Sequence, residues 1–153
     1  MDDHVFKSIV VGTDGSGTAT EAVRHAAGLA KLVGATLHVI TAYQAMSPLA
    51  AMGPDAGAAV LASGAREEAE RAAKEIVERA SRQASDEGIE VRSHIRPGDP
   101  ATVLVEVAEE EGADLIVVGN KGMSGVKRFV LGSVPNKVSH HCPCSLLIVN
   151  TAG

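Results

Sequence analysis

Five short apolar segments, separated by stretches of a different pattern, limit the possible folds of this chain more than any other feature. The segments are rich in Val, Ile and Leu, and strands are expected at residues 5–12, 36–42, 89–95, 114–118 and 144–149. The intervening stretches are expected to be helical at about 18–33, 64–87, 100–111 and 133–141. Strands that alternate with helices predict a parallel sheet covered on both faces. The expected fold class is therefore α/β, an open five-stranded parallel sheet with helices on both faces.

The chain is expected to form a single domain over residues 1–153. Its composition and charge exclude some classes of binding partner. Aromatic residues make up only 2% and Trp is absent, so Val, Ile, Leu and Ala are expected to fill the core. So few aromatic rings leave little surface for stacking on bases, which argues against single-stranded nucleic-acid binding. The net charge of -5 gives no general attraction to DNA or to an anionic membrane. We therefore expect no nucleic-acid partner.

Three features of the sequence favour a cytoplasmic location. No apolar run reaches the roughly 18 residues of a membrane span, so none is expected. The acidic start, residues 1–4, lacks the pattern of a signal peptide. The two cysteines, Cys142 and Cys144, do not make a disulfide framework, which is usual for a reducing compartment.

Residues 43–63 differ from the rest of the chain. They contain Met, Pro, Gly and several Ala, with almost no charge. This composition predicts a loop with at most a turn of helix. Apolar loops of this length often serve as lids or contact surfaces.

The glycines after the fourth expected strand form the strongest binding motif. Gly119-x2-Gly122 follows the apolar run directly, and Gly132-Ser133 comes ten residues after Gly122. Glycine lets a backbone turn sharply and approach a ligand closely. Ser133 is expected to be the N-cap of the next helix, whose free N–H groups and positive dipole end attract anions. The motif therefore predicts a phosphate-binding site.

The first expected strand ends in a similar turn, Gly12-Thr13-Asp14-Gly15-Ser16. Ligands of open parallel sheets bind beyond the carboxyl ends of the strands. If the first and fourth strands are neighbours, their two turns face each other across a crevice. Taken alone, Asp14 is explained as well by a helix cap or an Asx turn as by ligand binding, and Ser16 is the other candidate cap.

Several charged and metal-ligating residues have alternative interpretations. Lys121, Lys127 and Arg128 are either phosphate neighbours or solvated loop charges. The Walker pattern Gly-x4-Gly-Lys-Ser/Thr is missing, which argues against fast phosphoryl transfer. The run at residues 140–144, His-His-Cys-Pro-Cys, lacks the ligand spacing of structural zinc, and a helix end before a buried strand explains it better.

The remaining histidines are expected to have structural or surface roles. His38 lies within an apolar strand and is expected to be packed there. His25 and His94 are interpreted as surface positions.

The spaced glycine motif and its context resemble the universal stress protein family, specifically its ATP-binding branch. The resemblance rests on Gly119-x2-Gly122-x9-Gly132-Ser133, followed by Val-Pro, and on the opening strand and turn at residues 9–16. It covers about residues 6–149. It implies a five-stranded sheet of order 3-2-1-4-5 and a homodimer that pairs through the fifth strand, residues 144–149. An exposed apolar edge in that strand would itself favour pairing.

The resemblance also implies ATP, with Mg²⁺, as the ligand. The binding residues that it implies are Gly12, Thr13, Asp14, Val39, Gly119, Gly122, Gly132, Ser133 and Val134. Val39 would meet adenine through its backbone, and Asp14 would lie near the ribose, the phosphates and a nucleotide-bound Mg²⁺. Gly132, Ser133 and Val134 would hold the phosphates. Residues 43–63 have no clear match in the family pattern.

Three functions are compatible with these features. The leading hypothesis is a stress-response protein that binds ATP as a regulatory signal and acts on an unidentified protein partner. The alternatives are a slow ATPase or nucleotidyl-transferring enzyme, with Asp14 holding Mg²⁺, and a nucleotide-independent dimeric interaction module. A different adenine nucleotide, such as a cyclic one, is also compatible with a motif that chiefly reports phosphate.

Overall fold

The fold is a five-stranded parallel sheet with helices on both faces. The computed structural model describes residues 5–44, 56–120 and 132–151. The strands are β1 (Ser8–Gly12), β2 (Thr36–Tyr43), β3 (Val91–Pro97), β4 (Leu115–Gly119) and β5 (Ser145–Val149). They are all parallel and lie in the order β3-β2-β1-β4-β5. The predicted fold class and strand order are therefore confirmed.

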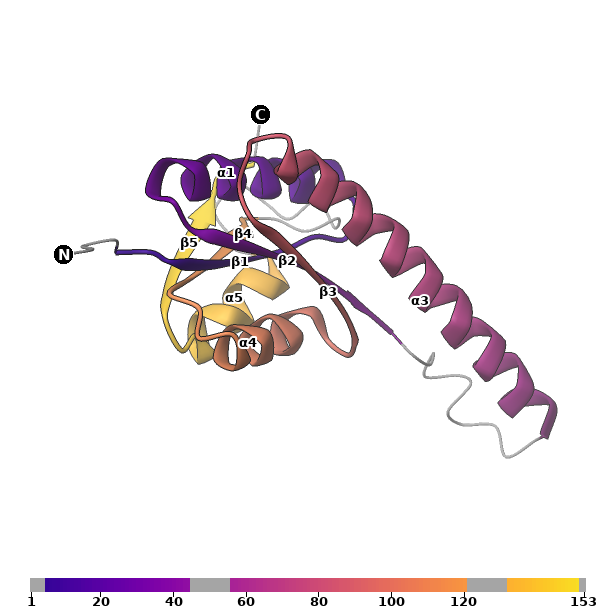
Figure 1. The fold of residues 1–153 in the computed structure, drawn as a ribbon. Coiled ribbons are helices and arrows are strands. Elements are labelled where there is room, and N and C mark those ends of the chain that lie inside the picture. The colour runs from indigo at the N-terminus through magenta and orange to yellow at the C-terminus, as the bar shows by residue number, and fades with distance from the viewer. Residues whose placement is uncertain (1–4, 45–55, 121–131, 152–153) are drawn as a thin grey trace.

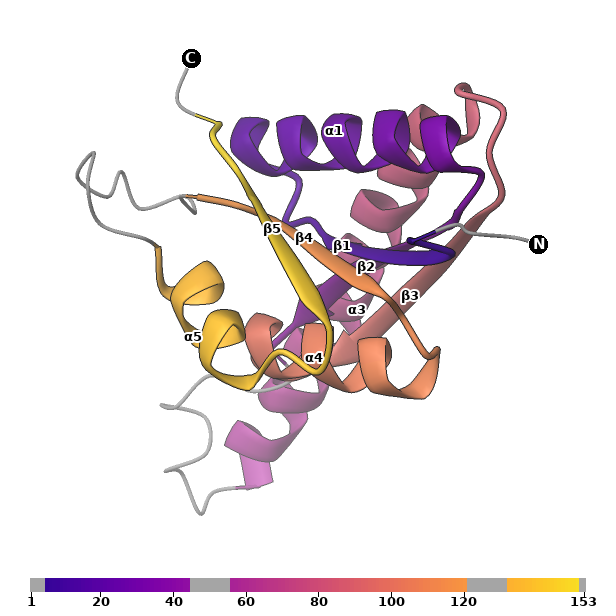
Figure 2. The same cartoon turned by 90° about the vertical axis from the view of Figure 1, so that its left-hand side faces the viewer.

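Two helices cover each face of the sheet (Figures 1 and 2). The helices α1 (Gly17–Val33) and α3 (Ala56–Ser85) lie on one face. The helices α4 (Pro100–Glu110) and α5 (Ser133–His141) lie on the other. Within the described residues, no helix is long and apolar enough to cross a membrane.

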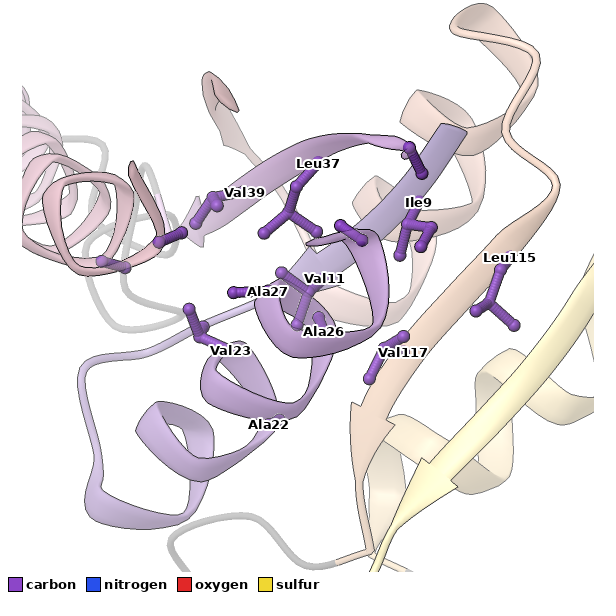
Figure 3. Close-up of a cluster of buried hydrophobic side chains, with 14 of the residues drawn as sticks. Ile9, Val11, Ala22, Val23, Ala26, Ala27, Leu37, Val39, Leu115 and Val117 are labelled. Carbon is purple, nitrogen blue, oxygen red and sulfur yellow. The ribbon is translucent and has the colours of Figure 1, made fainter. Parts of the chain in front are cut away.

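The central strands are buried on both sides, which explains their uninterrupted apolar sequences. Figure 3 shows Ile9 and Val11 of β1 directed toward α1. Val10, between them, belongs to the cluster under α4 and α5. All three side chains are fully buried. Small residues such as Ala22 and Ala26 let α1 lie close to the sheet.

The helix ends follow local chemistry that the sequence predicts. The side chain of Ser16 caps α1 by accepting the Ala19 N–H, and Gly34 ends α1 in the left-handed conformation with φ 74°. Asp99 caps α4 by accepting the Thr102 N–H, with Pro100 as the first helical residue.

The start of α3 corrects the expected loop at residues 43–63. The helix begins at Ala56, eight residues before the predicted start at 64, and projects past the sheet (Figure 1). Half of the segment 56–63 is Ala, and alanine has the highest intrinsic helix propensity. Its lack of charge made it look like the preceding loop. Residues 45–55 lie outside the described residues.

Candidate functional site

A cleft opens at the carboxyl ends of β1 and β4, where the strand order reverses and ligands of such sheets bind. It contains about 690 Å³ of open space, part of which is continuous with solvent. The lining residues are Gly12, Thr13, Asp14, Ser16, Thr18, Ala19, Ile40, Ala42, Pro100, Leu104, Val118, Gly119, Val134 and Pro135. Figure 2 shows that the end of β4 and the first turns of α1 and α5 lie on one side of the molecule.

The turn after β1 forms one wall and is held by local hydrogen bonds. The Thr13 N–H donates to the Ile40 carbonyl at 2.9 Å, and the Gly15 N–H donates to Thr13 Oγ1 at 3.1 Å. Asp14 Oδ1 accepts the Ser16 N–H at 2.9 Å, which makes an Asx turn. The structure therefore assigns the cap of α1 to Ser16 and leaves the Asp14 carboxylate exposed at the rim.

Gly12 is required at the base of this wall because α4 comes very close. A Cβ at Gly12 would lie 3.1 Å from Leu104 Cδ2. The missing side chain lets Leu104 of α4 reach the end of β1 and form part of the cleft. The glycine therefore shapes both the packing and the cavity.

The opposite wall follows β4 and is held by contacts between distant residues. The Asn120 N–H donates to the Val149 carbonyl at 2.9 Å, and the Gly132 N–H donates to the Asn120 carbonyl at 3.0 Å. Asn120 Oδ1 accepts the N–H of Thr151 at 3.0 Å and its hydroxyl at 2.9 Å. Asn120 thus joins the ends of β4 and β5 to the start of α5. Sequence reasoning missed this role, for which the only signal was an Asn directly after a buried strand.

The start of α5 also corrects the predicted cap. Gly132 is the N-cap, Ser133 is the first helical residue, and no side chain makes a capping hydrogen bond. Pro135 has no N–H, so Ser133 and Val134 supply the N–H groups of the first turn before Asn136, which donates to the Gly132 carbonyl. These groups and the helix dipole suit an anion.

The structure brings together part of the predicted binding set. The predicted residues that line the cleft are Gly12, Thr13, Asp14, Gly119 and Val134. Gly132 and Ser133 begin α5 next to Val134 without lining the cleft within the described residues. The side chain of Val39 is fully buried on the face that α1 and α3 cover (Figure 3), and its neighbour Ile40 lines the cleft. Gly122, with the basic residues at 121, 127 and 128, lies outside the described residues.

The lining of the cleft is divided into an apolar part and a polar rim. The apolar part consists of Ile40, Ala42, Leu104, Val118, Val134 and Pro135. The polar rim consists of Thr13, Asp14, Ser16 and Thr18. An apolar surface suits a planar ring, whereas hydroxyls and helix N–H groups suit a sugar and phosphates. The cleft can therefore hold a ligand with one apolar and one anionic end.

An ion pair fixes α4 and α5 beside the cleft. Lys137 Nζ lies 3.0 Å from Asp99 Oδ2, the oxygen that also caps α4. The hydrogen bond from Lys137 is the main cause that lowers the pKa of Asp99, and the bonds from Thr102 act in the same direction. Burial opposes this shift.

The predictions for the histidines outside the cleft are partly confirmed. His38 is 2% exposed, as expected, and His25 is exposed, as expected. The surface assignment of His94 is wrong: it is half-buried, and its Nε2 lies 3.0 Å from His38 Nδ1. The two residues are 56 positions apart, and only the pairing of β2 with β3 joins them. Cys142 and Cys144 are free thiols, and burial is the main cause that raises the pKa of Cys144 to about 12.

Comparison with known proteins agrees with this architecture. A family model, the universal stress protein family, matches residues 6–150. The universal stress protein Rv1636 of Mycobacterium tuberculosis is 38% identical over 149 residues, which cover 95% of this chain and 97% of the relative.

Two solved structures of similar proteins contain nucleotides. A universal stress protein in complex with cAMP is 32% identical, covers 96% of this chain and 98% of its own, and superposes with a TM-score of 0.70. The universal stress protein of Archaeoglobus fulgidus in complex with dAMP is 25% identical, covers 95% of this chain and 99% of its own, and has a TM-score of 0.68. Together with the family match over nearly the whole sequence, these similarities show that this chain belongs to the universal stress protein family.

Proposed function

We propose that this chain binds an adenine nucleotide, ATP, in the cleft at the ends of β1 and β4, and acts as a nucleotide-responsive protein in a stress response. The observation that carries the proposal is the divided cleft, with an apolar part beside a polar rim and the first turn of α5. The cAMP and dAMP complexes of related proteins support an adenine nucleotide as the ligand.

Each part of the nucleotide has a matching part of the cleft. The adenine ring would lie against Ile40, Ala42 and Leu104, where burial of apolar surface stabilises binding. The backbone of Val39, next to Ile40, is the predicted hydrogen-bonding neighbour of the ring. The phosphates would lie beside Gly119 and accept hydrogen bonds from the N–H groups of Ser133 and Val134.

The Asp14 carboxylate fits a nucleotide-bound Mg²⁺. Mg²⁺ in nucleotide sites is usually held by one or two carboxylates together with the phosphates. Asp14 lies at the rim of the cleft, and its Asx turn with the Ser16 N–H fixes the carboxylate there. When bound, the ion would neutralise phosphate charge.

Calorimetric titration of the purified protein tests the proposal. ATP, ADP and cAMP are titrated with and without Mg²⁺, and we expect binding of one nucleotide per chain. Asp14→Ala should weaken binding of Mg·ATP about tenfold, the loss expected for one charge-assisted contact. Asp86→Ala removes an exposed carboxylate after α3 and serves as the matched control. A protein that binds none of the three nucleotides contradicts the proposal.

A cyclic nucleotide is the second candidate ligand because a structure at 32% identity contains cAMP. Since cAMP has one phosphate and Mg·ATP has three, Mg²⁺ and Asp14→Ala should change the affinity for ATP and leave the affinity for cAMP unchanged. If cAMP binds more tightly than ATP, and neither Mg²⁺ nor Asp14→Ala changes its affinity, cAMP and not ATP is the ligand. Phosphate release measured in the same samples tests the slow ATPase, whose turnover should fall in Asp14→Ala.

We also propose that the protein forms a homodimer through β5 in the cytoplasm. β5 lies at one edge of the sheet, and Leu147 on it is 39% exposed. Edge strands with exposed apolar residues tend to pair or to be covered. Light scattering at micromolar concentration should give a dimer, and Leu147→Lys should shift it toward monomer, whereas Leu32→Lys should not. A monomer in the unsubstituted protein contradicts pairing through β5, and cell fractionation tests the location.

A further inference from the structure

Three potential metal ligands meet on the α4 face of the sheet, outside the nucleotide cleft. They are His38 of β2, His94 of β3 and Glu111, the C-cap of α4. Each offers one ligand atom, and these three atoms all lie within 4.8 Å of one another. None of the three lines the cleft.

The topology explains why residues so far apart in the sequence meet. Ile40 of β2 pairs with His94 of β3, and His38 lies two residues before Ile40. Residues two apart in a strand point to the same face, so His38, Ile40 and His94 share the face that α4 covers. α4 ends at this place, and Glu111 continues it as the cap.

The distance between the two imidazoles is close to that in a metal site. His38 Nδ1 and His94 Nε2 are 3.0 Å apart and share one proton in a hydrogen bond. Two nitrogens bound tetrahedrally to Zn²⁺, with bonds of about 2.05 Å, lie about 3.4 Å apart. An ion that replaces the shared proton therefore requires the two nitrogens to separate by only a few tenths of an ångström, and both rings to turn so that their lone pairs point to the ion beside the N–N line.

Burial of His38 and His94 disfavours the charged form of each imidazole. Burial is the largest cause that lowers the pKa of His38, followed by the charge on His94. Burial is also the largest cause for the lowered pKa of His94. The acidic neighbours Glu90, Glu110 and Glu111 oppose these shifts, whereas the basic neighbours Arg92 and Arg96 support them. Glu111 adds a carboxylate oxygen that compensates the charge of a cation.

We propose that His38, His94 and Glu111 bind one divalent transition-metal ion, for which Zn²⁺ is the test ion. Two imidazoles and one carboxylate suit Zn²⁺, Co²⁺ or Ni²⁺, whereas Mg²⁺ and Ca²⁺ prefer oxygen ligands alone. Three protein ligands leave a fourth position for water or an added ligand.

The ion links the edge of the sheet to α4. It joins β2 and β3 to the C-terminal end of α4, whose first turn lines the nucleotide cleft. The helix has 11 residues, so its two ends are about 16 Å apart. Metal binding therefore stabilises the position of the helix that forms one wall of the cleft.

Metal titration of tag-free, EDTA-treated and reduced protein tests this site. Zn²⁺ is titrated in competition with a chromophoric chelator, and Co²⁺ absorption reports the coordination geometry. We expect one high-affinity Zn²⁺ per chain, a tetrahedral Co²⁺ spectrum and a melting temperature that rises with added Zn²⁺. His94→Gln should lower the affinity by at least about 10–100-fold, the loss caused even by removing an outer partner of a ligand. Glu111→Gln should give a smaller loss in the same direction.

Matched controls separate this site from other ligands on the chain. His25→Gln and Glu109→Gln change exposed side chains outside the cluster and should leave the affinity unchanged. His141→Gln tests the run at residues 140–144 and should also have no effect. Melting curves in EDTA verify that each variant is folded. Zn²⁺ affinity that is equal in the unsubstituted protein and in folded His94→Gln overturns the proposal, as does a loss confined to His141→Gln.

Discussion

The two faces of the sheet share one backbone but differ in the side chains that cover them. On the α1 and α3 face, β1 and β2 meet α1, whose buried residues are all Ala or Val, and Ile9, Val11 and Leu37 are all fully buried (Figure 3). The α4 and α5 face has its own apolar cluster, but it also contains the buried His38 and borders the cleft. The α1 and α3 face is thus mostly hydrocarbon, with Thr41 as a buried polar side chain on it, whereas the other face also leaves open space beside its polar atoms.

This difference suggests how a small domain combines stability with binding. Interiors are packed densely, and a cavity gives up contacts that would otherwise stabilise the fold. Small side chains on α1 let that helix lie close to the sheet. On the other face, Leu104 closes over Gly12 and the cleft begins beside it. Substitutions on the two faces should therefore separate stability from ligand affinity.

The largest effect is expected from a truncation in the filled face. Leu37→Ala should lower the free energy of unfolding by about 2–5 kcal/mol, because it removes a fully buried side chain and leaves a cavity. Nucleotide affinity of the folded variant should not change. Urea denaturation measures the loss, with Leu32→Ala, 82% exposed in α1, as the control. A loss below about 1 kcal/mol would mean that this face tolerates cavities.

A smaller effect on stability and a larger one on binding are expected at Gly12. Gly12→Val adds a side chain where a Cβ already approaches Leu104 to 3.1 Å, so overpacking should cost about 1–3 kcal/mol. The added methyl groups should also enter the cleft and weaken nucleotide binding at least about tenfold (about 1.4 kcal/mol). Calorimetric titration and urea denaturation measure the two quantities.

Gly28→Ala is the matched control for this substitution. A Cβ at Gly28 meets nothing within 4 Å, and the residue lies inside α1. Alanine there should stabilise the fold by up to about 1 kcal/mol without affecting the ligand. Unchanged nucleotide affinity in Gly12→Val would place the nucleotide outside this cleft.

Removing the cap of α4 should have a moderate effect. Asp99→Ala deletes the oxygen that accepts the Thr102 N–H and the partner of Lys137. Loss of an N-cap typically costs about 1 kcal/mol. Asp99→Asn keeps a capping oxygen and should lose less, as thermal or urea unfolding of both variants can show. Equal losses would assign the effect to the ion pair and not to the cap.

The smallest effect concerns the charge on Asp99. Because the pKa of Asp99 is lowered in the folded protein, mainly by Lys137, its contribution is complete above the ordinary value of 3.8 and disappears as the pH falls through the folded pKa. The carboxylate is about half exposed, so the contribution should be about 0.2–1 kcal/mol and weaker at high salt. Unfolding measured between about pH 5 and pH 2 should lose this increment in the unsubstituted protein but not in Asp99→Asn. Parallel pH profiles of the unsubstituted protein and Asp99→Asn would contradict this prediction.

The local parts of the fold were predictable from the sequence. The apolar runs indicate the strands, and short-range chemistry indicates the helix ends at Gly34, Asp99 and Pro100. The turn after β1 is equally local, because Asp14 and Ser16 bond within three residues of their own positions. Errors arose where a local pattern was ambiguous. The apolar, uncharged start of α3 was interpreted as a loop. The N-cap of α5 was placed at Ser133, one residue after its observed position at Gly132.

Contacts across the sheet were decided only by the tertiary structure. Asn120 joins the ends of β4 and β5 to α5 through Val149, Thr151 and Gly132, and nothing near it in sequence indicates those partners. His94 was expected at the surface. Its pairing with His38 depends on the register of β2 against β3.

The sequence by itself determined the fold class, the strand order through a family resemblance, and the candidate phosphate motif at Gly119, Gly132 and Ser133. It could do so because periodicity, capping and turn chemistry act over a few residues. The tertiary structure decided the wall that Leu104 builds over Gly12 and the meeting of His38, His94 and Glu111. Those contacts join residues separated by tens of positions, and strand register and helix packing bring them together only when the whole sheet forms.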